Sequence, residues 1–211
     1  MELEGIKTSS GNLIARVSPD VVEFPLVLFA ITSDGKKCLY FDGSLPAAVQ
    51  NKLSMRGLQS FNIEQAMGVL RLFDIHSKLG CFRTYIFPYR FVSRDIRIVK
   101  CYRQDDPQIV AFGFSGLANK VYAIEREGTI ISACVSFRQN SKSAEAWVFT
   151  HPDYRRKGYA HRVVTAWAGS MRQEHIIPFY SHNIENINSA KLANKMGLIH
   201  MYDEFVIEKM V

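Results

Sequence analysis

The chain has 211 residues, which is enough for one large domain or two small ones around a real hydrophobic core. Hydrophobic residues make up 47% and charged residues 22%, as in an ordinary soluble globular protein. The formal charge of +6 suits an anionic ligand, but the basic residues are dispersed without a long Lys/Arg run, so we expect no nucleic-acid partner.

The start of the chain, MELEGIKTSSGN, has neither the basic beginning nor the apolar stretch of a signal peptide. The longest apolar run, 21–31, is interrupted by Glu23 and Pro25 and is too short to span a bilayer. The cysteines lie far apart without a CxxC pair, which argues against a zinc site and, in the cytosol, against disulfides. We expect a cytoplasmic protein with no metal, no membrane partner and buried thiols at Cys38, Cys81, Cys101 and Cys134.

Residues 1–93 predict a small α/β unit that ends in the turn Ser93-Arg94-Asp95. A helix follows Pro46, and Asn62 caps a second one. Apolar and β-branched runs bounded by turn residues predict strands over 12–18, 26–32, 37–41 and 81–87. We expect the unit either to form one wall of an acceptor pocket or to provide a homodimer face.

Residues 94–211 predict a second, mixed α/β domain. Asp106-Pro107 opens a helix, and Glu127-Gly128 turns a hairpin. Gly197 ends the last helix, which begins near residue 188. Strands are predicted over 96–101, 121–125, 129–137, 145–150, 176–181, 200–206 and 207–210.

The functional prediction depends mainly on the stretch Ala144–Met171. Residues 145–150 are apolar except for the first, which predicts a strand buried on both faces, and Pro152 ends it. The segment 155–160, RRKGYA, leads into an amphipathic helix. Free backbone N–H groups, the helix dipole and a glycine that permits close approach favour a pyrophosphate site. The loop is neither a Walker loop nor GxGxxG, and alone it also fits a basic helix start facing water.

Two blocks in this order resemble the GNAT superfamily of acyl-CoA-dependent N-acetyltransferases. Arg155, Gly158 and Ala160 match its Q/R-x-x-G-x-G/A loop, and 150–155, THPDYR, resembles its V-x-P-x-Y-R lead-in. The later family block, N-x-x-S/A followed by Gly-Leu, is matched by Asn186-Ile187-Asn188-Ser189 and Gly197-Leu198. The resemblance covers about 94–211 and is strongest in 130–200. It implies the GNAT fold, a mixed twisted sheet flanked by helices.

The resemblance also implies acetyl-CoA as co-substrate, no metal, and direct attack of an amine on the thioester without a covalent enzyme intermediate. For Val148–Thr150 it implies backbone binding of pantetheine, while their side chains pack in the core. Asn186 and Ser189 are either ligands of the CoA arm or helix caps. The implied cofactor-binding residues are Val148, Phe149, Thr150, Arg155, Arg156, Lys157, Gly158, Tyr159, Ala160, Asn186 and Ser189.

A base must remove the proton of the amine before attack. Glu145 resembles in position the glutamate that some members use, and His182 competes because imidazole titrates near neutrality. Each also fits a structural role, as a solvated strand-end carboxylate or a satisfied histidine. Many members carry a tyrosine four residues before the glycine as the acid, but Ala193 stands there. Ser189, Tyr180 or Tyr159 could replace it, or the thiolate could leave without an acid.

The sequence therefore predicts an N-acetyltransferase that acts on a small-molecule amine. Two alternatives stay open: a non-catalytic acyl-CoA-binding sensor or scaffold, and an N-acetyltransferase of protein N-termini or lysines. Fold alone does not choose among them, and no residue identifies the acceptor.

Overall fold

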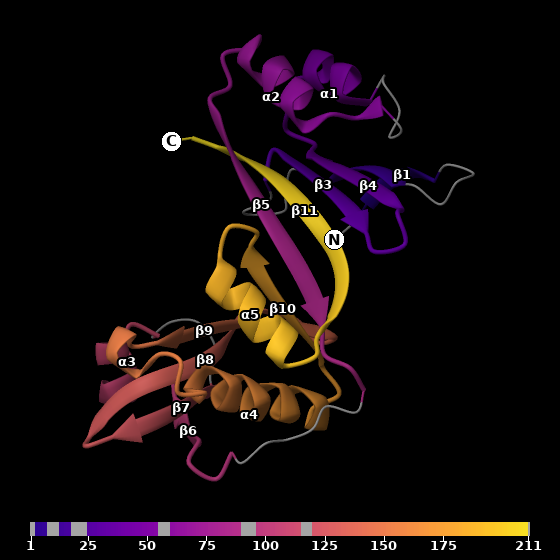
Figure 1. Ribbon diagram of the computed structural model, residues 1–211. Helices are drawn as coiled ribbons and strands as arrows, with labels where there is room; N and C mark the ends of the chain where they lie inside the picture. The colour runs from indigo at the N-terminus through magenta and orange to yellow at the C-terminus, as the bar shows by residue number, and fades with distance from the viewer. Residues whose placement is uncertain are drawn as a thin grey trace. The chain divides into compact units, whose positions relative to one another are not determined.

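The computed structural model describes residues 3–7, 13–17, 25–54, 60–89, 96–114 and 120–210, with the backbone alone for 3–7 and 13–17. The chain divides into two compact units (Figure 1). The first unit consists of Met1–Thr84, Asn183–Glu185 and His200–Val211, and the second of Tyr85–His182 and Asn186–Ile199. Both are α/β units, as predicted.

The first unit contains a sheet in the order β1-β2-β4-β3-β11-β5. β2 pairs with β4 in parallel, and the pairs β1/β2, β3/β4 and β3/β11 are antiparallel. Helices α1 (Ala47–Ser54) and α2 (Ile63–Arg71) pack on this sheet through a shared apolar core. The strands are β1 (Leu3–Lys7), β2 (Leu13–Val17), β3 (Val27–Thr32), β4 (Lys37–Asp42), β5 (Ser77–Ile86) and β11 (Ile199–Lys209).

The second unit contains a sheet in the order β10-β9-β8-β7-β6, in which only the β9/β10 pair is parallel. A short 3₁₀ turn, η2 (Pro152–Tyr154), follows β9. The strands are β6 (Lys100–Arg103), β7 (Lys120–Arg126), β8 (Thr129–Gln139), β9 (Ser143–Thr150) and β10 (Ile177–Asn183). The helices are α3 (Pro107–Phe112), α4 (Tyr159–Gln173) and α5 (Ile187–Lys195).

Helices cover the two faces of the second sheet differently. α4 and α5 pack on one face, here called the inner face, through a core that includes Trp167, Ala146, Tyr180 and Ala193. α3 packs on the opposite, outer face, where Ile109 meets Val121, Ala133 and Val135. The inner core is the larger one because two helices contribute to it. The outer face of the sheet is therefore the one that is more exposed to solvent.

Local signals in the sequence are confirmed where they concern capping and turns. Asn62 accepts hydrogen bonds from the N–H groups of Glu64 and Gln65, at 2.8 and 3.3 Å, and Asp106 accepts one from Gln108 at 2.9 Å. Glu127 and Gly128 have φ of 52° and 77°, as a tight β7–β8 hairpin requires. These features depend on neighbours in the chain.

Predictions that depend on distant parts of the chain fared differently. The predicted boundary after residue 93 differs from the observed division, because Tyr85 and Phe87 belong to the core of the second unit. The strands predicted over 200–206 and 207–210 are one strand, β11, and it pairs with β3 in the first unit. The strand predicted over 96–101 is also wrong in part, because residues 97 and 98 form a turn and β6 begins at Lys100.

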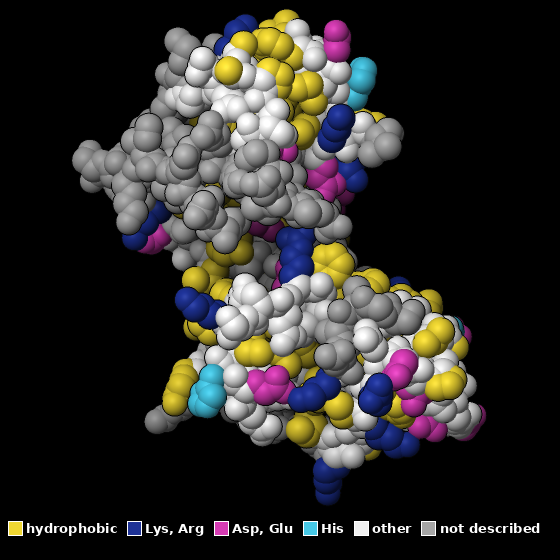
Figure 2. All heavy atoms as spheres, turned by 180° about the vertical axis from the view of Figure 1, so that it is seen from behind, with side chains coloured by type: hydrophobic (Ala, Val, Ile, Leu, Met, Phe, Trp, Pro, Cys, Tyr) yellow, Lys and Arg dark blue, Asp and Glu magenta, His cyan; other side chains and the backbone are white. Residues whose placement is uncertain are grey.

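The surface and the thiols complete the fold. Lys and Arg side chains are scattered over the face drawn in Figure 2. No helix in the described ranges is long and apolar enough to cross a membrane. The prediction of buried thiols holds for Cys134, whose pKa is raised well above its usual value by burial. It is wrong for Cys101, which is exposed, and for Cys38 and Cys81, which are half-buried.

Candidate functional site

The connection from β9 to α4 is a tight loop that presents the start of a long helix. The His151 N–H donates to the Ile131 carbonyl at 2.9 Å, and η2 then reverses the chain. Arg156 and Gly158 both have positive φ, of 62° and 83°. Gly158 is the N-cap of α4, and no side chain caps this helix. The left-handed conformation explains why glycine stands there.

Three features make this loop suited to an anion. The N–H groups of the first turn of α4 have no carbonyl partner within the helix, and the helix dipole adds partial positive charge. A Cβ built on Gly158 would meet no atom within 4 Å, so the space above it is open. Arg155, Arg156 and Lys157 are exposed, and in the described part of the chain none forms an ion pair with a carboxylate.

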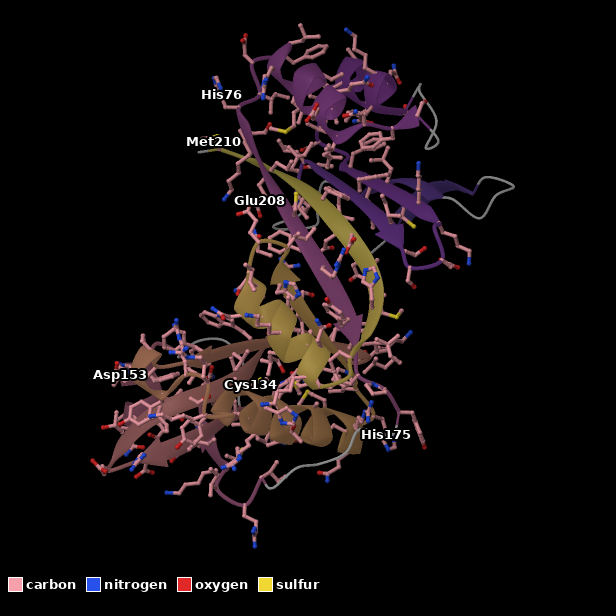
Figure 3. All side chains as sticks on the ribbon, in the orientation of Figure 1. His76, Cys134, Asp153, His175, Glu208 and Met210 are labelled. Carbon is pink, nitrogen blue, oxygen red and sulfur yellow. The ribbon has the colours of Figure 1, made fainter. Side chains whose placement is uncertain are left out.

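The basic side chains of the loop instead contact backbone and rings. The Arg155 Nε donates to the Thr150 carbonyl at 3.1 Å, and its guanidinium lies 5.8 Å from the centre of the Phe149 ring. The Lys157 Nζ donates to the Asp153 carbonyl at 3.1 Å and lies 5.2 Å from the Tyr154 ring. Tyr159 and Ala160, in the first turn of α4, are half-buried. Figure 3 labels Asp153 at this end of the sheet. The charges of Arg155 and Lys157 therefore remain available to an anion.

β9 and β10 pair over only part of their length. Their parallel ladder runs from Ser143–Ile177 to Ala146–Tyr180, yet β9 continues to Thr150 and β10 to Asn183. We call the last pair, Ala146–Tyr180, the branch point. Val148, Phe149 and Thr150 lie beyond it, so the ladder with β10 does not engage their backbone groups. The ladder between β8 and β9 shifts register in β8, where Phe137 is the extra residue.

Side chains of β9 alternate between two unlike environments. Ala144, Ala146 and Val148 pack on the inner face. Trp147 and Phe149 point to the outer face and are 41% and 39% exposed. The prediction that this strand is buried on both faces is therefore wrong, because α3 covers less of the sheet than α4 and α5 do.

The same alternation separates the two candidate bases. Glu145 precedes Ala146 and so lies on the outer face, opposite Arg138 of β8. Its carboxylate is half-buried and makes no hydrogen bond or ion pair with the side chains that the structure describes. His182 lies two residues after Tyr180, on the inner face, where it is buried. Its ring stacks on Tyr85 with centroids 5.6 Å apart and lies 6.3 Å from Tyr180. The two residues cannot act on the same side of the sheet.

Tyr180 occupies the branch point itself. Its side chain is only 2% exposed, and burial raises the pKa of its phenol to about 12, while a hydrogen bond with the Ser189 hydroxyl opposes this shift. Ala193, one turn further along α5, is fully buried in the inner core. Of the acids that the sequence left open, Tyr180 and Ser189 therefore lie together at the end of the β9–β10 ladder.

The structure shows which hydrogen bond Asn186 makes, for which the sequence left open a helix cap or a ligand of the CoA arm. It is the N-cap of α5, and its Oδ1 accepts a hydrogen bond from the Ser189 N–H at 3.1 Å. This position satisfies a donor of the first turn. Asn186 is therefore a helix cap, and its role toward the CoA arm stays a prediction.

Sequence reasoning missed a group of aromatic side chains on the outer face. Trp147 stacks on Phe114 with centroids 4.7 Å apart, and Phe137 packs edge-on against Trp147 with centroids 5.9 Å apart. Phe149 meets Phe112 at 5.6 Å, and Phe112 meets Phe114 at 5.2 Å. We call these five residues the outer aromatic cluster. The signal that could have found it is the alternation of Glu145, Trp147 and Phe149 with small or aliphatic residues.

No three His, Cys, Asp or Glu side chains among the described residues come together in a group that could hold a metal ion. We derive no role for a metal from this site.

Comparison with known proteins identifies the same part of the chain as the candidate site described above. Residues 121–204 match the family model described as GNAT acetyltransferase, a range that begins within β7, contains β8, β9, α4, β10 and α5, and ends within β11. This range includes the Gly158 loop, the branch point and both candidate bases. No curated protein sequence matches the chain.

Solved structures share the fold. A GCN5-related N-acetyltransferase-like protein from Streptococcus suis has a TM-score of 0.55 and 13% identity, over 99% of this chain and 82% of that one. A GNAT-family acetyltransferase from Colwellia psychrerythraea gives 0.51 and 13%, over 89% and 83%. A GNAT-family protein from Novosphingobium aromaticivorans gives 0.53 and 16%, over 64% of this chain and 66% of that one, just under two thirds of its length. At these identities the likeness shows the fold.

Proposed function

Residues 121–204 match the GNAT acetyltransferase family model, and from this premise we propose that the chain transfers an acetyl group from acetyl-CoA to the primary amine of a small molecule. The observation that carries the proposal is the continuity of β9 and α4. The backbone of β9 continues beyond the β9–β10 ladder and leads through η2 into the start of α4, which has no side-chain cap. Such an arrangement can hold an elongated molecule with an anionic end.

In this proposal the loop binds the pyrophosphate of acetyl-CoA. The N–H groups at the start of α4 donate to phosphate oxygens, and Gly158 lets the phosphate approach the backbone. Arg155, Arg156 and Lys157 add positive charge around it. The pantetheine arm would follow Val148–Thr150, with a backbone N–H near Phe149 polarising the thioester carbonyl.

The chemistry needs a base and an acid on different groups. Glu145 takes one proton from the ammonium group, directly or through water, before the neutral nitrogen attacks the thioester carbon. The C–S bond then breaks, and the nitrogen loses its second proton to solvent as the amide forms. Tyr180 gives its phenolic proton to the departing thiolate, and the Ser189 hydroxyl stabilises the phenolate left behind. His182 packs on the inner face beside Tyr180, away from Glu145, so we assign it a positioning role on Tyr180 and not the base.

The acid assignment predicts the behaviour of Tyr180→Phe. The variant should lower kcat about tenfold to a hundredfold, within the range seen for proton-transfer groups, while acetyl-CoA affinity stays the same. Ser189→Ala should have a smaller effect in the same direction. Steady-state kinetics with a thiol-specific chromophore would measure both.

A matched control exists in the same unit. Tyr122 is another buried tyrosine, and it forms a hydrogen bond with Ser170. Tyr122→Phe therefore removes a similar Tyr–Ser pair away from the branch point and should leave kcat nearly unchanged. Equal losses in the two variants would show that Tyr180 acts only through packing.

The proposed function is tested by ligand-dependent stability followed by turnover. Acetyl-CoA or coenzyme A at about a hundred times its dissociation constant should raise the free energy of unfolding by roughly 2.7 kcal/mol, whereas ATP should not. Thiol release from acetyl-CoA in the presence of a set of primary amines then tests transfer. If acetyl-CoA stabilises the protein but releases no thiol with any amine or lysine peptide, the proposed catalysis is wrong and the protein only binds CoA. No stabilisation would overturn the cofactor.

A further inference from the structure

The two faces of the second sheet differ in access at the branch point. On the inner face, Ala146 and Tyr180 are 6% and 2% exposed beneath α4 and α5. On the outer face, Trp147 is the first side chain of β9 beyond the branch point, and it is 41% exposed. An amine that reaches a thioester held at this point must therefore approach along the outer face.

The outer face presents ring surface to such an amine. Phe137 and Phe149 flank Trp147 and are 49% and 39% exposed, while Phe114 supports Trp147 from below by stacking. In the view from behind, hydrophobic side chains reach the surface of the second unit on the side where α3 lies (Figure 2). A contiguous group of partly exposed large aromatic side chains is a feature of binding surfaces more than of ordinary surface.

Charge distinguishes Trp147 from the rings beside it. Arg138 lies over Phe137 with its guanidinium 5.5 Å from the ring centre, and Arg155 lies over Phe149 at 5.8 Å. Within the described residues, no Lys or Arg lies over Trp147, although tryptophan is the ring that attracts cations most strongly. Glu145 lies two residues away on the same face and has no ion-pair partner among those residues.

We propose that the outer aromatic cluster, together with Glu145, is the acceptor subsite of this protein and that it takes arylalkylamines. The aromatic group of the acceptor stacks on Trp147 between Phe137 and Phe149, and its ammonium group turns toward Glu145. The inference rests on the proposed function and adds the acceptor class to it. Arg138 and Arg155 border the cluster, so they repel a second positive charge and favour an acceptor with a single ammonium group.

Two amines that differ only in the ring test the proposal. With saturating acetyl-CoA, kcat/KM for 2-phenylethylamine should exceed that for ethylamine by at least about tenfold, since a buried ring adds apolar contact and stacking. Trp147→Leu should remove most of this ratio. Trp147→Phe, which keeps a ring, should restore part of it.

Binding can be followed without turnover. The sequence has two tryptophans, and Trp167 is fully buried, so Trp147 should dominate any quenching of tryptophan fluorescence by 2-phenylethylamine. The quenching should be lost in Trp147→Phe. Tyr89→Leu is the matched control, because Tyr89 is 96% exposed in the same unit and lies outside the cluster.

The outcomes separate this inference from the proposed function. Stabilisation by acetyl-CoA with equal kcat/KM for the two amines, or with a lysine peptide preferred to both, would overturn the acceptor subsite and leave acetyl transfer in place. Absence of stabilisation by acetyl-CoA would overturn the proposed function itself. A ring preference that survives in Trp147→Leu would place the acceptor elsewhere.

Discussion

Gly158→Asp should weaken binding of coenzyme A and acetyl-CoA at least about a hundredfold, a loss of roughly 2.7 kcal/mol. The side chain would occupy the open space above the start of α4, and its carboxylate would repel phosphate where the helix dipole attracts it. Isothermal titration calorimetry on the folded variant measures the change.

The substitution also strains the backbone, because Gly158 has φ of 83°, so a control must share that strain. Gly128 has φ of 77° in the β7–β8 turn, and a Cβ there also meets nothing within 4 Å. Gly128→Asp should therefore lose similar stability yet bind coenzyme A normally. Unchanged affinity in folded Gly158→Asp would remove the cofactor assignment.

Glu145→Gln should lower kcat about a hundredfold to ten-thousandfold, the range for loss of a general base, without changing acetyl-CoA affinity. Glutamine keeps the shape of the side chain but cannot accept the proton of the ammonium group. Raising the pH should then recover part of the rate, because more of the amine is already neutral.

Glu127→Gln provides the comparison, since Glu127 is an exposed residue of the β7–β8 turn. It should behave as the unsubstituted protein. If Glu145→Gln retains full turnover at every pH, the base is a water relay that does not use this carboxylate. Loss of turnover in His182→Gln with a shifted pH profile would instead return the role to the inner face.

Sequence patterns predicted the parts of the site that depend on neighbouring residues. Gly158 was predicted from the strand–loop–helix order, and the structure places it in the left-handed conformation as the N-cap of α4. The caps at Asn62 and Asp106 and the turn at Glu127-Gly128 follow from the same local rules. Each of these features is determined by a few neighbouring residues, so it can be predicted from the local sequence.

Which side chains share a face depends on pairing between distant strands, and the sequence did not reveal it. The sequence offers both Glu145 and His182 as candidate bases. The register of Ala146 with Tyr180 places Glu145 and His182 on opposite faces of the sheet. The exposure of Trp147 depends on how little of the outer face α3 covers. The hydrophobic pattern alone predicts Trp147 to be a core residue, because it does not distinguish a tryptophan buried in the core from one exposed at a binding surface.

The return of β11 to the first unit has a consequence for how the protein is made. β11 lies between β3 and β5, and Ile207 is fully buried in the core with α1 and α2. Figure 3 labels the place where β5 and β11 run side by side: the Met210 N–H donates to the His76 carbonyl at 2.9 Å, and Lys78 pairs with Glu208. During synthesis the ribosome releases β1–β5 long before β11, so the early strands must wait with a central strand missing. Contacts of such long sequence separation slow folding and expose strand edges in the meantime. The second unit consists of Tyr85–His182 and Asn186–Ile199, so its sequence is available before most of β11 emerges, and it can therefore form first.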